Sequence, residues 1–323
     1  MIEFKSLDWL QEIYKNINFN NLPHGIIING PNGTGKELLA REISSRLLIN
    51  KNKQTIDTDL FISNNHPDFY LLDKEKILIN DISRRKGKWD DDKGFKDVIS
   101  FLSLTPSVSI NKVVLILNAD TMNGESQNAL LKTLEEPPRN SFLIMTTKRS
   151  KSLFDTIYSR CQTINIPPPK SDELDKWLTK QGITEYKSND FPSFETPLNI
   201  ISLISNNKQN IFKDFVNIVN NFLKGLNDQN DVIKDFDKID IDLITKLNFL
   251  VEYLKILIRS KILMENLSGI YKELNKASFN NLKISNLINE VNDLREDFFK
   301  VPQINETHVL NYFLSELRNS IKI

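Results

Sequence analysis

A glycine-rich loop between an apolar run and a helical segment constrains the fold of this 323-residue chain more than any other feature. The loop reads Gly30-Pro-Asn-Gly-Thr-Gly35-Lys36, with the apolar run 25–29 before it and the helical segment 37–48 after it. Glycines let backbone N–H groups curl around phosphate oxygens, the helix N-terminus adds positive potential, and the lysine reaches the terminal phosphates. This order of strand, loop, lysine and helix predicts a P-loop fold. The candidate nucleotide-binding residues are Gly30, Gly33, Thr34, Gly35 and Lys36.

Further apolar runs in the first half of the chain predict strands at 113–117, at 141–146 and from residue 164. The segment 126–134 reads as a helix that ends before Pro137, because proline restricts the conformation of the residue that precedes it. Strands alternating with helices are typical of a parallel sheet with crossover helices. We therefore expect an α/β domain in this half.

The second half has a different pattern, in which long amphipathic helices rich in Asn, Lys and Ile replace the strand signals from about residue 208. Two apolar stripes at helical spacing are typical of a helical bundle core, and a subunit interface on the same bundle is compatible with them. The stripes are Leu247, Leu250, Val251, Leu254 and Ile258, and Leu287, Val291, Leu294 and Phe298. The prolines at 167–169 indicate a linker. We expect a P-loop core at 1–165, a small helical lid at 166–205 and an all-α domain at 206–323.

The acids that an ATPase needs are missing from their expected positions. A P-loop lysine is normally followed by Ser or Thr, whose hydroxyl binds Mg²⁺, but Glu37 stands there. The end of the second strand normally carries one acid for the metal and one that orients the attacking water. Here Leu117 and Asn118 occupy those positions, and Asp120 is expected to cap the next helix. These residues predict that the chain does not hydrolyse ATP, while binding of ATP or ADP without hydrolysis stays open.

Composition narrows the possible partners and compartments. Lys plus Arg and Asp plus Glu both number 42, so the net charge is zero, which disfavours a chain that grips nucleic acid by itself. The single cysteine, Cys161, excludes a disulfide framework and a cysteine-rich zinc site. The first residues carry acids where a signal peptide has an apolar core, and no run is long enough to span a membrane. We expect a cytoplasmic protein without membrane contact and without a bound metal.

The segment 126–138, Ser-Gln-Asn-Ala-Leu-Leu-Lys-Thr-Leu-Glu-Glu-Pro-Pro, and the later Ser159-Arg160-Cys161 carry a family resemblance. They resemble the bacterial DNA polymerase III clamp-loader subunits, which belong to the AAA+ class. Supporting stretches are Leu22-Pro-His-Gly25, His66-Pro-Asp68 and 101–106, so the resemblance covers most of residues 1–165 in order. It implies an AAA+ core, a helical lid and an all-α collar that joins subunits. Beyond Pro168 the resemblance is architectural.

Within this family the altered residues favour the δ′ type over the motor (γ/τ) type, which keeps both nucleotide motifs intact. Thr196-Pro-Leu-Asn199 also lacks the arginine that a motor's lid offers to its own nucleotide. The resemblance implies that Arg160 acts in trans on the ATP of a neighbouring motor subunit, since guanidinium pairs well with phosphate oxygens. The alternative for this residue is a surface arginine that forms an ordinary salt bridge. Implied partners are the motor (γ/τ) and δ subunits, with the sliding clamp and primed DNA reached through the complex. The chain would then be part of the DNA polymerase III holoenzyme without being catalytic alone; an active ATPase motor is the alternative.

Two stretches depart from the family pattern. Relatives commonly carry a four-cysteine zinc module before the His66-Pro-Asp68 stretch, whereas residues 50–65 contain no cysteine, so we expect no zinc and a short loop there. The segment 83–95 is more charged than usual, is expected to be an exposed loop, and has no predicted function.

Several other residues have simple interpretations. His24 and His66 are expected to serve packing or turns, and Cys161 to be a small buried side chain. Thr146 and Thr147 stand where AAA+ proteins place a phosphate sensor, with a structural hydroxyl as the alternative. For Lys132, Glu135 and Glu136 a solvated helix face is expected, with orientation of partners or DNA as the alternative.

Overall fold

A five-stranded parallel sheet forms the centre of the first half of the chain in the computed structural model, which describes residues 2–48, 54–83, 97–239, 241–298 and 305–322. The strand order is β2-β3-β4-β1-β5, and every neighbouring pair is parallel. The strands are β1 (Gly25–Asn29), β2 (Phe69–Leu72), β3 (Lys112–Ile116), β4 (Ser141–Thr147) and β5 (Gln162–Asn165). Since β1, β3 and most of β4 are buried, the continuous apolar runs that predicted them reflect a sheet covered on both faces.

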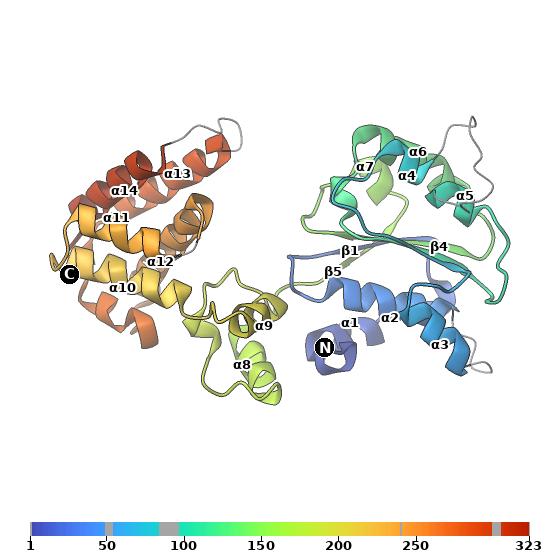
Figure 1. Cartoon of the computed structure of the whole chain (residues 1–323), viewed down its shortest axis with the longest axis horizontal. Coiled ribbons are helices and arrows are strands. Elements are labelled where there is room, and N and C mark those ends of the chain that lie inside the picture. Colours follow the sequence, from blue (N-terminus) through green and yellow to red (C-terminus); the bar gives the residue numbers. More distant parts are fainter. Residues whose placement is uncertain (1, 49–53, 84–96, 240, 299–304, 323) are drawn as a thin grey trace. The chain divides into compact units, whose positions relative to one another are not determined.

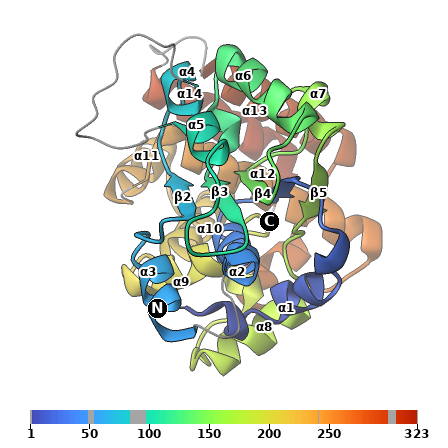
Figure 2. The same cartoon turned by 90° about the vertical axis from the view of Figure 1, so that its right-hand side faces the viewer.

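Helices cover both faces of this sheet, as Figures 1 and 2 show. One face carries α1 (Asp8–Lys15), α2 (Lys36–Leu48) and α3 (Gln54–Ile62). The other carries α4 (Ile79–Ile82), α5 (Val98–Leu102), α6 (Gly124–Glu135) and α7 (Asp155–Tyr158). Short 3₁₀ turns lie at Phe4–Ser6, Phe19–Asn21 and Ala119–Thr121. The predicted α/β P-loop fold with a parallel sheet is confirmed.

The remaining elements are almost entirely helical. They are α8 (Ser171–Lys180), α9 (Pro197–Ser205), α10 (Ile211–Leu223), α11 (Gln229–Lys238), α12 (Leu243–Leu263), α13 (Asn281–Phe298) and α14 (Glu306–Ser320), with 3₁₀ turns at Ser188–Asp190 and Gly269–Lys276. A two-stranded antiparallel pair joins β6 (Ser278–Phe279) to β7 (Ile321–Lys322). The core of this part contains stacked Phe215 and Phe236 rings, whose centroids are 5.0 Å apart. The predicted apolar stripe of α12 is largely buried in that core, and so are Leu287 and Val291 of α13.

The chain divides into two compact units. The first comprises residues 1–170 together with Thr196–Asn199, and the second comprises 171–195 and 200–323. The short segment Thr196–Asn199 therefore belongs with the P-loop unit, although its flanking residues belong with the helical unit. The three-part division at 165 and 205 stays a prediction. Within the described ranges, no helix combines the length and apolarity needed to cross a bilayer.

Two local predictions were wrong, and one lies beyond what is described. Residues 54–62 form helix α3 instead of a short loop. Asp120 does not cap α6, because the Asn123 side chain accepts the hydrogen bond from the Ser126 N–H at that position. The charged segment 84–95 lies outside the described residues.

Candidate functional site

The glycine-rich loop lies at the carboxyl end of β1, between the ends of β4 and β5. Gly33 and Gly35 adopt φ angles of 75° and 92°, in the left-handed region that favours glycine. The loop passes directly into α2, as the sequence predicted. The structure thus brings Gly30, Gly33, Thr34, Gly35 and Lys36 together as one phosphate loop.

Lys36 is bound to its own loop. Its Nζ donates to the carbonyl oxygens of Gly30 at 2.6 Å and of Pro31 at 2.8 Å, and the side chain is buried. Burial lowers the pKa of Lys36 to about 8, which the Asp120 carboxylate opposes and the Lys148 ammonium reinforces. Two of the three N–H donors of the ammonium group are therefore engaged by carbonyl oxygens of the loop itself.

Two segments from elsewhere in the same unit pack against this loop. From α1, Trp9 Nε1 donates to the Thr34 carbonyl oxygen at 3.0 Å, and a Cβ on Gly35 would lie 2.7 Å from Leu10. From the segment Thr196–Asn199, Thr196 Oγ1 donates to the Asn32 carbonyl oxygen at 2.6 Å.

The segment Thr196–Asn199 packs very closely against the glycine-rich loop. The Leu198 N–H donates to the Gly33 carbonyl oxygen at 3.0 Å, and a Cβ on Gly33 would lie only 2.1 Å from Thr196 Oγ1. The segment Thr196–Asn199 contains no arginine and presents a threonine hydroxyl hydrogen-bonded to the loop.

Glu37, Leu117 and Asn118 occupy the positions where an ATPase carries its metal-binding and water-orienting residues. Here their contacts are with other protein groups. Glu37 pairs with Arg41 at 2.8 Å, and Leu117 is buried. Asn118 has a φ of 51°, and its N–H donates to Thr146 Oγ1. Over the described parts of the chain, no group of three or more His, Cys, Asp or Glu side chains is arranged to hold a metal ion.

Asp120 is a carboxylate near the loop whose place the sequence did not reveal. It lies in the 3₁₀ turn Ala119–Thr121, where Oδ1 accepts a hydrogen bond from the Lys148 N–H at 3.3 Å. Its charge favours the protonated form of Lys36. The only hint in the sequence was its position after a strand, since carboxyl ends of parallel strands meet at one edge of the sheet.

The two threonines at the end of β4 both make hydrogen bonds. Thr146 accepts from the Asn118 N–H, and the Thr147 hydroxyl donates to Asn29 Oδ1 at 3.2 Å. Both side chains are buried. This geometry fits the structural alternative for these hydroxyls, and a sensor role for them stays a prediction.

Arg160 lies at the opposite end of the sheet. It follows α7 and comes just before β5, which pairs with β1 from Ile26 onward. Its side chain is about one-third exposed, and the guanidinium makes three hydrogen bonds, to the Thr156 carbonyl oxygen, Ser159 Oγ and Glu135 Oε1. Because strands rise ~3.3 Å per residue, the five residues of β1 separate its two ends by roughly 13 Å. The structure therefore does not bring Arg160 and the phosphate loop together.

The remaining signature residues meet around the start of β1. A Cβ on Gly25 would lie 2.7 Å from Cys161 Sγ and 2.9 Å from Leu134, so only glycine fits there. Burial raises the pKa of the Cys161 thiol to about 12, which disfavours a nucleophilic role. His24 Nδ1 donates to the Ser141 carbonyl oxygen at 2.5 Å. Residues of the signatures before β1, along α6 and before β5 thus pack together next to Arg160 in the chain.

The stretch His66-Pro-Asp68 holds the loop before β3. Asp68 is fully buried and accepts hydrogen bonds from the N–H groups of residues 107, 108 and 109, at 2.7 to 2.8 Å. It also pairs with buried Lys112 at 3.2 Å. Burial alone would raise the pKa of Asp68, but these hydrogen bonds outweigh it and lower the pKa. The stretch is a structural anchor of the amino end of the sheet.

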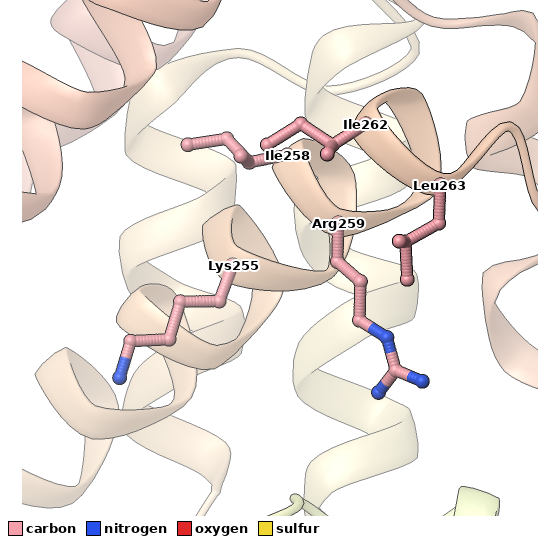
Figure 3. Close-up of a pocket in the computed structure, with 5 residues that line it drawn as sticks. All are labelled: Lys255, Ile258, Arg259, Ile262 and Leu263. Atoms are coloured by element: carbon pink, nitrogen blue, oxygen red, sulfur yellow. The ribbon is translucent and has the colours of Figure 1, made fainter.

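A shallow hollow lies on the C-terminal half of α12 in the helical unit. Figure 3 shows Ile258 and Ile262 lying side by side there, with Arg259 and Leu263 next to them and Lys255 one turn earlier. Its lining contains no carboxylate, thiol or imidazole. Lys255 and Arg259 instead give it two cationic groups beside apolar side chains.

The parallel sheet and the phosphate loop define the class of protein, a P-loop α/β protein. A family model described as DNA polymerase III, delta subunit, matches residues 6–170, which is just over half of the chain. The chain belongs to this DNA polymerase III delta subunit family.

Individual relatives agree with the family. The DNA polymerase III subunit delta' of Buchnera aphidicola subsp. Baizongia pistaciae is 29% identical over 63% of this chain and 62% of its own length. The subunits of the same name from Haemophilus influenzae and Bacillus subtilis are 28% and 26% identical, over 55% and 57% of this chain and 54% and 56% of their own lengths. The chain thus spans little more than half the length of the curated relatives that it matches.

A solved structure of a DNA polymerase III gamma subunit-related protein from Thermotoga maritima covers 98% of this chain and 99% of its own length. It is 17% identical, with a TM-score of 0.47. At that level of similarity the family assignment rests on the sequence match alone.

Proposed function

We propose that this chain acts as a δ′-type subunit of a bacterial replicative clamp loader, where it organises ATP hydrolysis without performing it. Its partners would be the motor (γ/τ) and δ subunits, with the sliding clamp and primed DNA reached through the complex in the cytoplasm. Support comes from the family match and from relatives named DNA polymerase III subunit delta'.

The observation that carries the proposal is the separation of Arg160 from the chain's own phosphate loop. The two lie at opposite ends of β1, so this arginine cannot serve the nucleotide site of its own chain. Its side chain is partly exposed in the turn between α7 and β5, as that of a group acting on a neighbouring subunit would be. A guanidinium is permanently charged and can offer paired donors to phosphate oxygens. In trans, such an arginine typically raises phosphoryl transfer by ~10³-fold or more.

The phosphate loop supports the other half of the proposal, the absence of hydrolysis. Leu117 cannot bind Mg²⁺, and Asn118 is a poor base for orienting water. Lys36 is bound to its own loop, and Thr196 is hydrogen-bonded to the loop at Asn32. Nucleotide binding would require these contacts to rearrange. The loop thus has the form of a nucleotide site without its metal and water chemistry.

The test is ATP hydrolysis by a loader reconstituted from motor, δ and δ′ subunits with clamp and primed DNA. The Arg160→Ala chain should assemble normally and lower hydrolysis sharply, while the isolated wild-type chain should be inactive. Arg139→Ala removes an exposed guanidinium from the neighbouring loop at the same end of the sheet and serves as the matched control. Turnover of ATP by the isolated chain would instead identify it as an active motor. Equal rates for loaders containing the wild-type and the Arg160→Ala chains would contradict the trans role.

A further inference from the structure

Glu135 occupies a position that is unfavourable for a carboxylate by itself. It is the last residue of α6, and Glu136 follows it at the helix C-cap. The C-terminal end of a helix carries partial negative charge, so cations are favoured there and acids are not. Two consecutive acids at this end therefore call for a separate explanation.

An ion pair with Arg160 accounts for the carboxylate of Glu135 at this helix end, but not for that of Glu136. Arg160 Nη2 donates to Glu135 Oε1 at 2.7 Å, and the two side chains are 34% and 50% exposed. Within the described part of the chain, the structure records no ion pair for the exposed Glu136 carboxylate. An ion pair this exposed contributes little to stability. Its consequence is geometric, because it fixes where the guanidinium points.

The hydrogen bonds of Arg160 leave part of the guanidinium available. Nη1 donates to the Thr156 carbonyl oxygen at 2.8 Å and to Ser159 Oγ at 3.1 Å, and Nη2 donates to Glu135. These contacts use three of the five N–H donors of an arginine, so two remain for an incoming group. Glu135 and the end of α7 thus hold the guanidinium from two directions without covering it.

We propose that Glu135 is a positioning residue for Arg160, which holds the guanidinium in one orientation before a neighbouring subunit's phosphate arrives. This inference rests on the proposed function of Arg160. A long arginine side chain loses rotamer freedom when it becomes ordered, and a partner that orders it beforehand removes that cost from the catalytic step. Glu135 itself does not touch the phosphate in this account.

The test is a double-mutant cycle in the reconstituted loader, with hydrolysis measured at saturating ATP. Glu135→Ala should lower the maximal rate by roughly 2- to 10-fold, which corresponds to the cost of ordering one long side chain during the reaction. The isosteric Glu135→Gln should lower it less, because its carbonyl oxygen still accepts from Nη2. The matched control Glu136→Ala should keep the wild-type rate.

The decisive comparison uses the Arg160→Ala background, where Glu135→Ala should have no further effect because it acts only through that arginine. Full additivity of the two changes would overturn the inference. So would a wild-type rate with Glu135→Ala, or a higher rate, which would mean that the carboxylate competes with the phosphate. If Arg160→Ala itself has no effect, the proposed function fails and this inference fails with it. If Arg160→Ala lowers the hydrolysis rate sharply and Glu135→Ala leaves it unchanged, the inference about Glu135 is wrong and the proposed function stands.

Discussion

Each end of the parallel sheet carries a cationic side chain of a type that binds phosphate, but one of these side chains is buried and the other is partly exposed. At the carboxyl end, Lys36 is buried and bound to the carbonyl oxygens of its own loop, which other segments also contact. At the amino end, Arg160 is partly exposed, and only three of its donors are engaged.

This difference indicates how a P-loop fold can keep its architecture while its function changes. The loop at the carboxyl end still orders the sheet and α2, because its glycines and its lysine satisfy one another. The packing around Gly25, Leu134 and Cys161 at the amino end fixes the chain next to Arg160.

The largest effect is expected from breaking the anchor of the amino end with Asp68→Ala. The change leaves Lys112 buried without its carboxylate and removes the acceptor of three backbone N–H groups. Removing one partner of a buried pair costs about 3–5 kcal/mol of the free energy of unfolding. Urea unfolding measures this loss, and Asp73→Ala, at an exposed position nearby, should cost far less. Equal losses in both variants would show that Asp68 is not an anchor.

A smaller effect is expected at the carboxyl end from Gly33→Ala. The new Cβ would sit at positive φ and 2.1 Å from Thr196 Oγ1, so the segment Thr196–Asn199 must shift. Strain of this kind costs about 1–3 kcal/mol. Gly182→Ala is the matched control, since its φ of 81° is also positive but nothing lies within 4 Å of the added atom. Thermal unfolding should show a larger loss for Gly33→Ala, and losses of the same size would mean that Thr196 does not press on the loop.

The smallest stability effect is expected from pH acting on His24. Burial lowers the pKa of this imidazole, and the hydrogen bond to the Ser141 carbonyl oxygen offsets it only in part. The folded state then binds fewer protons than the unfolded state between the lowered pKa and about 6.5, so the free energy of unfolding falls as pH drops through that window. Melting temperatures between pH 5 and 8 should drop more for wild type than for His24→Asn. Parallel curves for the two proteins would exclude His24 as the source.

Local patterns in the sequence predicted the fold well, because sheet strands buried on both faces leave continuous apolar runs. The runs that include Ile27, Val114 and Leu143 therefore identified β1, β3 and β4. The sequence did not place Asp120, because the chain turns at Asn118 with a φ of 51°, which Asn tolerates and which leaves no periodicity. The prediction of a short loop at 54–62 was also wrong. It was made because the cysteines of the zinc module are missing there, and the structure has helix α3 at these residues.

The candidate site depended more on contacts distant in the sequence. The order of strand, loop and helix was enough to find the phosphate loop, since all its residues are consecutive. The hydrogen bond between Thr196 and Asn32 joins residues far apart in the chain, and no local spacing encodes it. The same holds for Glu135 and Arg160, because a solvated helix face was the simplest interpretation of Glu135 from its neighbours alone.

The central claim is that the two ends of the sheet have exchanged roles, and one paired measurement tests it most directly. Hydrolysis by the reconstituted loader is compared for chains carrying Arg160→Ala and Lys36→Met, each with confirmed assembly. The account predicts a sharp loss, of the order of 10³-fold at the affected site, for Arg160→Ala and a wild-type rate for Lys36→Met. A sharp loss with Lys36→Met and none with Arg160→Ala would contradict it, because the chain would then be hydrolysing at its own loop.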